Sequence, residues 1–204
     1  MLAVIFVVGD QVARSYAQNM LASKIQSDGF PVKPTVSIKG WPFLTQVAAR
    51  DVRTIDISAS DVQEGKLDIS SINATASGVH LNSSFNGATI DSITGTGLIT
   101  FSSVASAAGA QGVTISADPS AGPDIAKVSA GPLNTTAKVV QTGASRITVQ
   151  VQSVEGIPAS VIGGLPDYTI DVPNLPVGLQ ITGVSVTSQG VEIQISAHNT
   201  TLSQ

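Results

Sequence analysis

Residues 38–46 read Ile-Lys-Gly-Trp-Pro-Phe-Leu-Thr-Gln. This stretch contains the single tryptophan of a chain in which aromatic residues make up only 4% of the sequence. An aromatic side chain buries about 150–250 Å², so Trp41 and Phe43 carry much of the apolar surface of this region. Gly40 and Pro42 interrupt regular secondary structure beside them. The stretch therefore predicts a defined corner of the fold, which either seals a core or presents an apolar lip.

The segment before this corner has the pattern of a helix. Between Asp10 and Asp28, apolar residues recur three and four positions apart, and they are Val12, Tyr16, Met20, Leu21 and Ile25. Gly29 supplies a C-terminal stop, and the prolines that follow prevent continuation. We therefore expect one long N-terminal helix, which the apolar residues before Asp10 can extend.

The chain after the corner has the alternation that is typical of β-strands. Expected strands cover residues 54–59, 66–76, 113–117, 125–130, 136–140, 146–152, 181–186 and 191–195. The apolar phase shifts by one residue near Ser70-Ser71 and again across Thr182-Gly183, and such a shift predicts a β-bulge. Repeated bulges curve a sheet. Residues 102–110 are rich in small side chains and predict a short helix, and a further helical turn is expected over residues 158–162.

The first residues form an apolar segment of their own. Residues 2–8 are continuously apolar, but a membrane span needs about 20 such residues, and a signal peptide needs a basic segment ahead of its apolar core. We interpret the run as the end of a longer N-terminal signal-anchor, the alternative being the buried start of an ordinary helix or strand. The expected organisation is an anchor remnant at residues 1–9 and a single domain at residues 10–204.

Composition excludes several classes of function. The chain has 204 residues, a net charge of −4 and no cysteine. The acidic balance argues against nucleic acid as the main partner. The lack of cysteine excludes disulfides, thiolate metal sites and thiol nucleophiles.

Catalytic signals are weak. His80 and His198 are the only histidines, and neither stands in a recognisable catalytic motif. The aspartates between Asp51 and Asp68 are spaced too loosely for a calcium loop. We expect no enzyme activity, no metal and no cofactor. A glycolipid-cleaving enzyme that uses paired carboxylates remains a third hypothesis.

The apolar stripe of the expected helix has two interpretations. The commoner use of such a stripe is to pack on a sheet as core. Alternatively, the helix lines an apolar cavity inside a curved sheet, with room for a hydrocarbon chain.

Two sequence signatures carry a family resemblance. The frame Ile38-x-Gly40-x-Pro42-Phe43-Leu44-Thr45-Gln46 resembles the hallmark of the LmeA-like phospholipid-binding family of actinobacteria, once described only as a domain of unknown function. Residues 175–186, Leu-Pro-Val-Gly-Leu-Gln-Ile-Thr-Gly-Val-Ser-Val, followed by Gly190-Val191-Glu192-Ile193, resemble its second signature.

The resemblance implies an α+β fold, mostly β, in which a highly curved, bulged antiparallel sheet wraps the long N-terminal helix, similar to the tubular lipid-binding (BPI-like) domains. It also implies a location in the cell envelope outside the cytoplasm, with an N-terminal anchor in the cytoplasmic membrane. The family is associated with phosphatidylinositol-type lipids and with lipoglycan maturation, and it supplies no catalytic residues to carry over.

The leading hypothesis is a lipid-binding envelope protein that holds phospholipid acyl chains in an apolar cavity. The expected partners are phospholipid or glycolipid and a membrane surface. The residues expected to line the cavity are Tyr16, Met20, Leu21, Ile25, Trp41, Phe43 and Leu44. The basic residues expected to meet a headgroup or membrane surface are Lys24, Lys33, Lys39, Arg50 and Arg53. The second hypothesis is a structural or adhesive envelope β-domain with a solid core and no ligand.

Overall fold

The protein is described from a computed structural model, which defines residues 2–64, 67–107, 112–118, 120–154, 168–171 and 178–203. Its helices are α1 (Leu2–Ser27), α2 (Phe43–Ala49) and α3 (Phe101–Ala107). The strands are β1 (Thr35–Ile38), β2 (Asp51–Glu64), β3 (Leu67–Leu81), β4 (Gly87–Thr100), β5 (Val113–Ala117), β6 (Ile125–Ala130), β7 (Leu133–Gly143), β8 (Arg146–Val154), β9 (Tyr168–Asp171), β10 (Gln180–Val186) and β11 (Gly190–Ser203).

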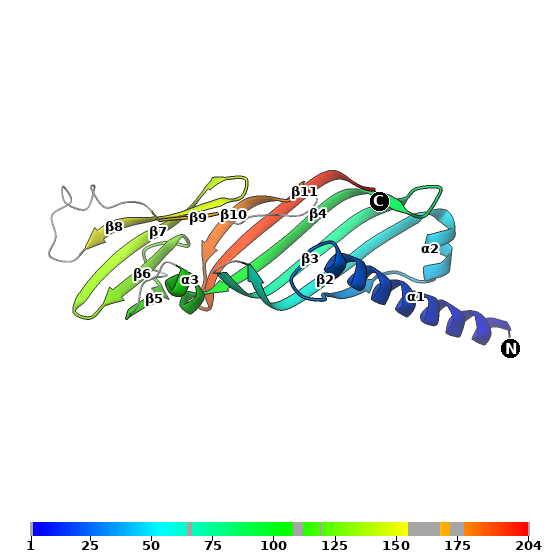
Figure 1. The fold of residues 1–204 in the computed structure, drawn as a ribbon, viewed down its shortest axis with the longest axis horizontal. Helices are drawn as coiled ribbons and strands as arrows, with labels where there is room; N and C mark the ends of the chain where they lie inside the picture. Colours follow the sequence, from blue (N-terminus) through cyan, green and yellow to red (C-terminus); the bar gives the residue numbers. More distant parts are fainter. Residues whose placement is uncertain are drawn as a thin grey trace.

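The described strands form two antiparallel sheets. The larger sheet has six strands in the order β1-β2-β3-β4-β11-β10, and the smaller has five in the order β5-β6-β7-β8-β9. The sheets follow one another along the long axis of the molecule, and α1 lies against one face of the larger sheet (Figure 1). The fold is therefore α+β and mostly strand, with a long N-terminal helix, as expected.

The N-terminal helix is longer than its periodic segment. α1 runs without a break from Leu2 to Ser27, so the early apolar run and the helix expected from Asp10 form one element. This helix crosses the boundary expected after residue 9. Among the described residues, no helix has the length and apolar character needed to cross a bilayer.

Two hydrophobic clusters hold the fold together. The first, here called the helix-side core, joins α1 and α2 to the larger sheet, and its buried members include Ala22, Val36, Ile38, Phe43, Val52, Ile55, Val79 and Ile90. The second, here called the joining core, links the two sheets and α3, and its buried members are Leu67, Ile99, Val104, Ala126, Val139, Ile147, Ile181, Val186, Val191 and Ile193. Each cluster buries the apolar face of the larger sheet near one end of the strands.

Both expected bulges are present. The pairing of β3 with β4 shifts register between Ile69 and Ser71, and the pairing of β10 with β11 shifts between Ile181 and Gly183. Because a one-residue shift without a bulge would turn apolar side chains to the opposite face, the bulges keep Ile69 and Val184 on the side of the joining core.

Several elements were not expected from the sequence. α2 lies where only a corner was predicted, and β1, β4 and β9 were missed. The glycines of β4, at positions 87, 95 and 97, obscure its alternation, and β1 and β9 span only four residues each. The short helix expected at residues 102–110 is present as α3, with residues 108–110 outside the described part. The turn expected at residues 158–162 also lies outside the described residues.

The stability of the whole fold should depend on the joining core. Ile99 on β4 is only 2% exposed and belongs to the joining core, whose members come from both sheets, so Ile99→Ala should lower the free energy of unfolding by about 2–5 kcal/mol. Urea unfolding followed by circular dichroism measures this change. Leu202→Ala, at an exposed position of β11, is the control and should change stability by about 0.5 kcal/mol or less. Equal effects of the two substitutions would contradict the assignment of Ile99 to a shared core.

Candidate functional site

A buried carboxylate from α1 holds the corner in place. The Asp10 side chain is fully buried, and its Oδ1 accepts a hydrogen bond from the backbone N–H of Leu44 at 2.7 Å. The N–H of Phe43 also donates to this carboxylate. Both N–H groups belong to the first turn of α2, whose own N-cap residue, Pro42, provides no side-chain cap. Asp10 therefore caps α2 from another helix, where a negative charge is favourable.

Arg14 holds the other side of the corner. Its Nη2 donates to the carbonyl oxygen of Gly40 at 2.7 Å and lies 3.5 Å from Asp10 Oδ2. The pair sits one helical turn apart on the face of α1 that meets the body of the protein. The Trp41–Pro42 peptide bond within the corner is cis. The structural roles of Asp10 and Arg14 were not predicted from the sequence, although their spacing of four residues indicates that they can pair on one face of a helix.

The Gly and Gln of the corner motif have structural roles. Gly40 has a φ of +89°, and a Cβ at this position would lie 2.9 Å from Gln46 Nε2. The Gln46 side chain is buried, donates to the carbonyl of Lys39 at 3.2 Å and accepts from the N–H of Arg53 at 3.2 Å. The motif thus ties β1, α2 and β2 together through backbone contacts.

The charge of Asp10 is stabilised despite burial. Burial raises the pKa of this carboxyl, but the hydrogen bonds from Leu44 and Phe43 and the positive charge of Arg14 outweigh it, so the pKa of Asp10 lies below its ordinary value. Asp10 is therefore ionised at neutral pH.

The corner separates its aromatic residues. Phe43 is 5% exposed and belongs to the helix-side core, whereas Trp41 is 61% exposed and Leu44 is 38% exposed. The corner therefore both seals a core and presents an apolar lip, through different side chains.

α1 adds a second apolar surface beside this lip. Residues spaced three and four apart form an exposed stripe on the side of α1 away from the core, here called the outer stripe: Ile5, Val8, Val12, Tyr16 and Met20. The exposed Phe85 lies in the turn between β3 and β4, near α2, and the guanidinium of Arg50 sits 5.7 Å from its ring centroid. α2 and this turn share one end of the molecule, which the N-terminal part of α1 extends beyond (Figure 1). We call Trp41, Leu44, Phe85 and the outer stripe the apolar end.

The residues expected to line an acyl-chain cavity do not share one environment. Leu21 and Ile25 are half-buried against the helix-side core, while Tyr16 and Met20 lie in the exposed outer stripe. With Phe43 buried and Trp41 and Leu44 exposed, the set divides between core and surface. A cavity between α1 and the sheet stays a prediction.

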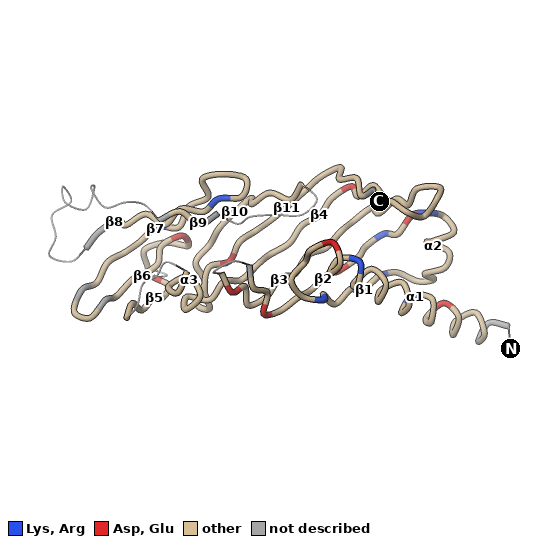
Figure 2. Tube along the Cα trace, in the orientation of Figure 1, with Lys and Arg blue, Asp and Glu red and all other residues tan. Residues whose placement is uncertain are grey.

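The expected basic residues also differ in their contacts. Lys24 pairs with Asp28 at 2.7 Å, and Lys39 pairs with Asp56 at 3.2 Å. Arg50 caps the C-terminus of α2 in the left-handed conformation. Charged residues are sparse along the chain, with most of the basic ones near α1, α2 and the strands beside them (Figure 2).

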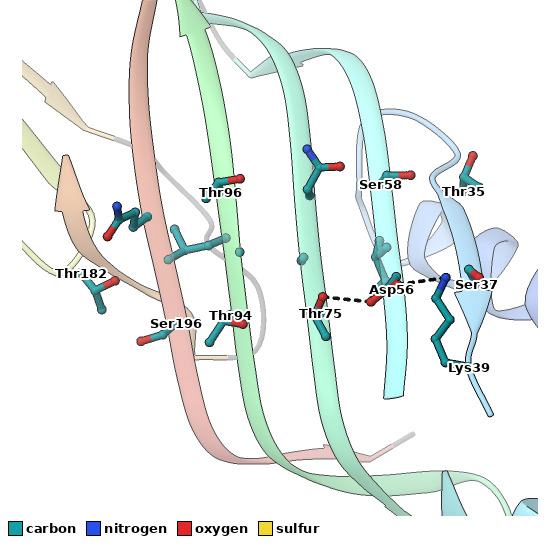
Figure 3. A pocket seen from close by; sticks show the side chains of 16 residues that line it. Thr35, Ser37, Lys39, Asp56, Ser58, Thr75, Thr94, Thr96, Thr182 and Ser196 are labelled. Carbon is teal, nitrogen blue, oxygen red and sulfur yellow. Dashed lines mark hydrogen bonds and ion pairs between the residues drawn. The ribbon is translucent and has the colours of Figure 1, made fainter. Parts of the chain in front are cut away.

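A groove crosses the other face of the larger sheet, away from α1 (Figure 3). Its volume is about 740 Å³. Most of its lining side chains are polar, and they come from β1, β2, β3, β4, β10, β11 and the adjoining Lys39. The strand register aligns them in two rows, one of Ser37, Asp56, Thr75, Thr94 and Ser196, the other of Thr35, Ser58, Asn73, Thr96 and Gln194. We call this feature the hydroxyl groove.

His80 lies on the surface between two aspartates. His80 lies 3.3 Å from Asp91 and 3.7 Å from Asp51 at an exposed position. Within the described residues, no three His, Asp or Glu side chains are grouped closely enough to hold a metal ion.

Comparison with known proteins identifies a family. The family model described as LmeA-like phospholipid-binding matches residues 8–196. Searches of curated proteins and of solved structures return no match. The matched range includes the corner, the hydroxyl groove and both sheets up to residue 196 in β11.

The division of the corner into core and lip can be measured. Phe43→Ala should lower the free energy of unfolding by about 3–5 kcal/mol, because a large buried ring is removed from the helix-side core. Leu44→Ala, the adjacent and more exposed position, keeps the backbone bond to Asp10 and should cost about 1 kcal/mol or less. Chemical denaturation compares the two variants, and a larger loss for Leu44→Ala would overturn the division.

The buried carboxylate predicts a pH dependence of stability. Because the pKa of Asp10 is lower in the folded state than its ordinary value of 3.8, its contribution to stability is fully present above about pH 4 and is lost as the pH falls through the folded pKa. Asp10→Asn should lower the midpoint of thermal unfolding at pH 7 and flatten the decline of stability below pH 4. Thermal unfolding of both proteins between pH 2.5 and 7 tests this. Parallel pH curves, with the same decline in acid, would contradict the assigned role.

Proposed function

The chain belongs to the LmeA-like phospholipid-binding family, and from this premise we propose that it binds phospholipid at a membrane surface through its apolar end. The single observation that carries the proposal is the exposed Trp41 on a corner fixed by Asp10 and Arg14, beside the outer stripe of α1. Water-soluble proteins rarely expose many large apolar side chains together unless these meet a partner or a membrane.

The apolar end has the chemistry of an interfacial contact. Trp and Tyr prefer the boundary between lipid headgroups and acyl chains, because their rings combine an apolar body with a polar group. The apolar end exposes one tryptophan, Trp41, and one tyrosine, Tyr16. Burial of apolar surface contributes about 25 cal/mol per Å², so each large exposed side chain that enters the bilayer contributes a few kcal/mol before ordering costs.

Basic side chains at the same end support an anionic phospholipid. Arg50 lies over Phe85, and Arg53 follows at the start of β2. Each basic residue near an anionic surface contributes about 1 kcal/mol. A phosphatidylinositol-type lipid, which the family resemblance implies, meets this requirement.

The wider role follows from the same resemblance. We propose that the protein acts outside the cytoplasm, in the cell envelope of an actinobacterium, with α1 directed toward the cytoplasmic membrane. In this role it binds lipid and supports lipoglycan maturation without itself catalysing a reaction. A fold similar to the tubular lipid-binding domains is part of this proposal, and the bulged sheet beside a long helix supports it.

A second candidate is a structural or adhesive envelope domain without a ligand. The observation in its favour is the packing of the helix-side core and the joining core, in which aliphatic side chains from helices and sheets are buried together. Vesicle binding separates the two candidates, because a purely structural domain has no reason to prefer phospholipid.

Removal of the exposed tryptophan provides the test. Trp41→Ala should weaken binding to vesicles that contain phosphatidylinositol by about tenfold or more, since it removes a large apolar contact. Vesicle flotation and the blue shift of tryptophan fluorescence on binding of the wild-type protein measure the interaction. Trp41→Phe should retain most of the affinity, because an aromatic ring remains.

Charge controls refine the same experiment. Arg53→Gln should reduce binding to anionic vesicles, and the reduction should shrink at high salt. Lys127→Gln on β6, in the smaller sheet, is the matched control and should leave binding unchanged. Absence of vesicle binding by the wild-type protein, or equal binding by Trp41→Ala, would sink the proposed function.

A further inference from the structure

The hydroxyl groove carries hydrogen-bonding capacity that the protein itself does not use. Within the described part of the chain, the hydroxyls of Thr94, Thr96 and Ser196 have no hydrogen-bond partner. Figure 3 shows these side chains standing on the same sheet face as Thr75 and Asp56. Each hydroxyl both donates and accepts, so the groove offers matched donors and acceptors to a bound molecule.

The charges in the groove neutralise one another. Lys39 Nζ lies 3.2 Å from Asp56 Oδ2, and Asp56 Oδ1 accepts a hydrogen bond from Thr75 at 2.9 Å. The remaining lining residues are uncharged. A strongly charged ligand would find no free counter-charge, whereas a neutral ligand rich in hydroxyls matches the lining.

The spacing of the rows favours rings. The two rows run across the strands, and neighbouring strands in a sheet lie about 4.7–4.9 Å apart. This step is close to the length of one sugar or cyclitol ring. The groove volume of about 740 Å³ lies within the range of small-molecule sites and leaves room for more than one ring.

We propose that the hydroxyl groove binds a neutral polyhydroxylated ligand, a cyclitol or a short chain of sugar rings, laid along its cross-strand rows. The proposal goes beyond phospholipid binding, because the groove lies on the sheet face away from α1, and it stands whether or not the apolar end meets a membrane. A lipid headgroup and a free glycan share this chemistry.

A soluble titration tests the groove without any membrane. We expect saturable binding of myo-inositol, or of linear hexasaccharides of glucose or mannose, to the full chain in isothermal titration calorimetry. The double variant Thr94→Val and Thr96→Val removes two hydroxyls at nearly constant volume and should weaken that binding by about tenfold. Thr89→Val is the matched control, since Thr89 is an exposed threonine on the same strand outside the groove, and it should bind as the wild type does.

Binding experiments with vesicles distinguish the two possible sources of the ligand. If the ligand is a lipid headgroup, the double variant should lose the preference for phosphatidylinositol over phosphatidylglycerol vesicles while it retains binding to both. If the ligand is a free glycan, the variant should lose only the binding of soluble oligosaccharide. Trp41→Ala should leave both soluble titrations unchanged, so failure of the membrane contact is distinguishable from failure of the groove.

Two results would overturn the proposal. One is the absence of any saturable binding by these soluble ligands together with equal binding to the two vesicle types. The other is an equal loss of affinity in Thr89→Val and in the groove variant. Urea midpoints that match the wild type show that the variants are folded before either comparison is made.

Discussion

The contact between the Asp10 carboxylate and the first turn of α2 is the constraint on which the apolar end of the molecule depends. It places a charge from the long helix beneath the corner, while Arg14 holds the Gly40 carbonyl on the other side. A buried ion that lost its hydrogen bonds would be costly, so helix and corner must move together. The position of Trp41 is therefore set by polar contacts, although its own surface is apolar.

This arrangement gives α1 two different faces. The face toward the protein combines Asp10 and Arg14 with the apolar residues of its C-terminal half, including Ala22 and Ile25. The opposite face carries the outer stripe, which no described part of the chain covers. In a water-soluble protein the exposed face of a helix is normally polar. The apolar side of α1 and the lip on the corner are thus two exposed apolar surfaces, and together they form the candidate surface for lipid.

The larger sheet is divided in a similar way. One face buries aliphatic side chains in the helix-side core and the joining core, and the other bears the hydroxyl groove. Strand alternation makes this division possible, and the bulge near Ser71 preserves it along β3. A membrane contact at one end and a polar groove on an open face are compatible, because they use different surfaces of the same sheet and helix.

The sequence by itself determined the long helix, many of the strands, both bulges and the family, because periodicity and short motifs are local properties. It also singled out Trp41 and Phe43. Only the tertiary structure decided that Phe43 is core and Trp41 is surface, that Asp10 reaches across 34 residues to Leu44, and that Thr75 and Thr94 stand in one row. It also separated the strands into two sheets. These features depend on which distant segments meet, and contacts between distant segments leave no periodic signal in a single sequence.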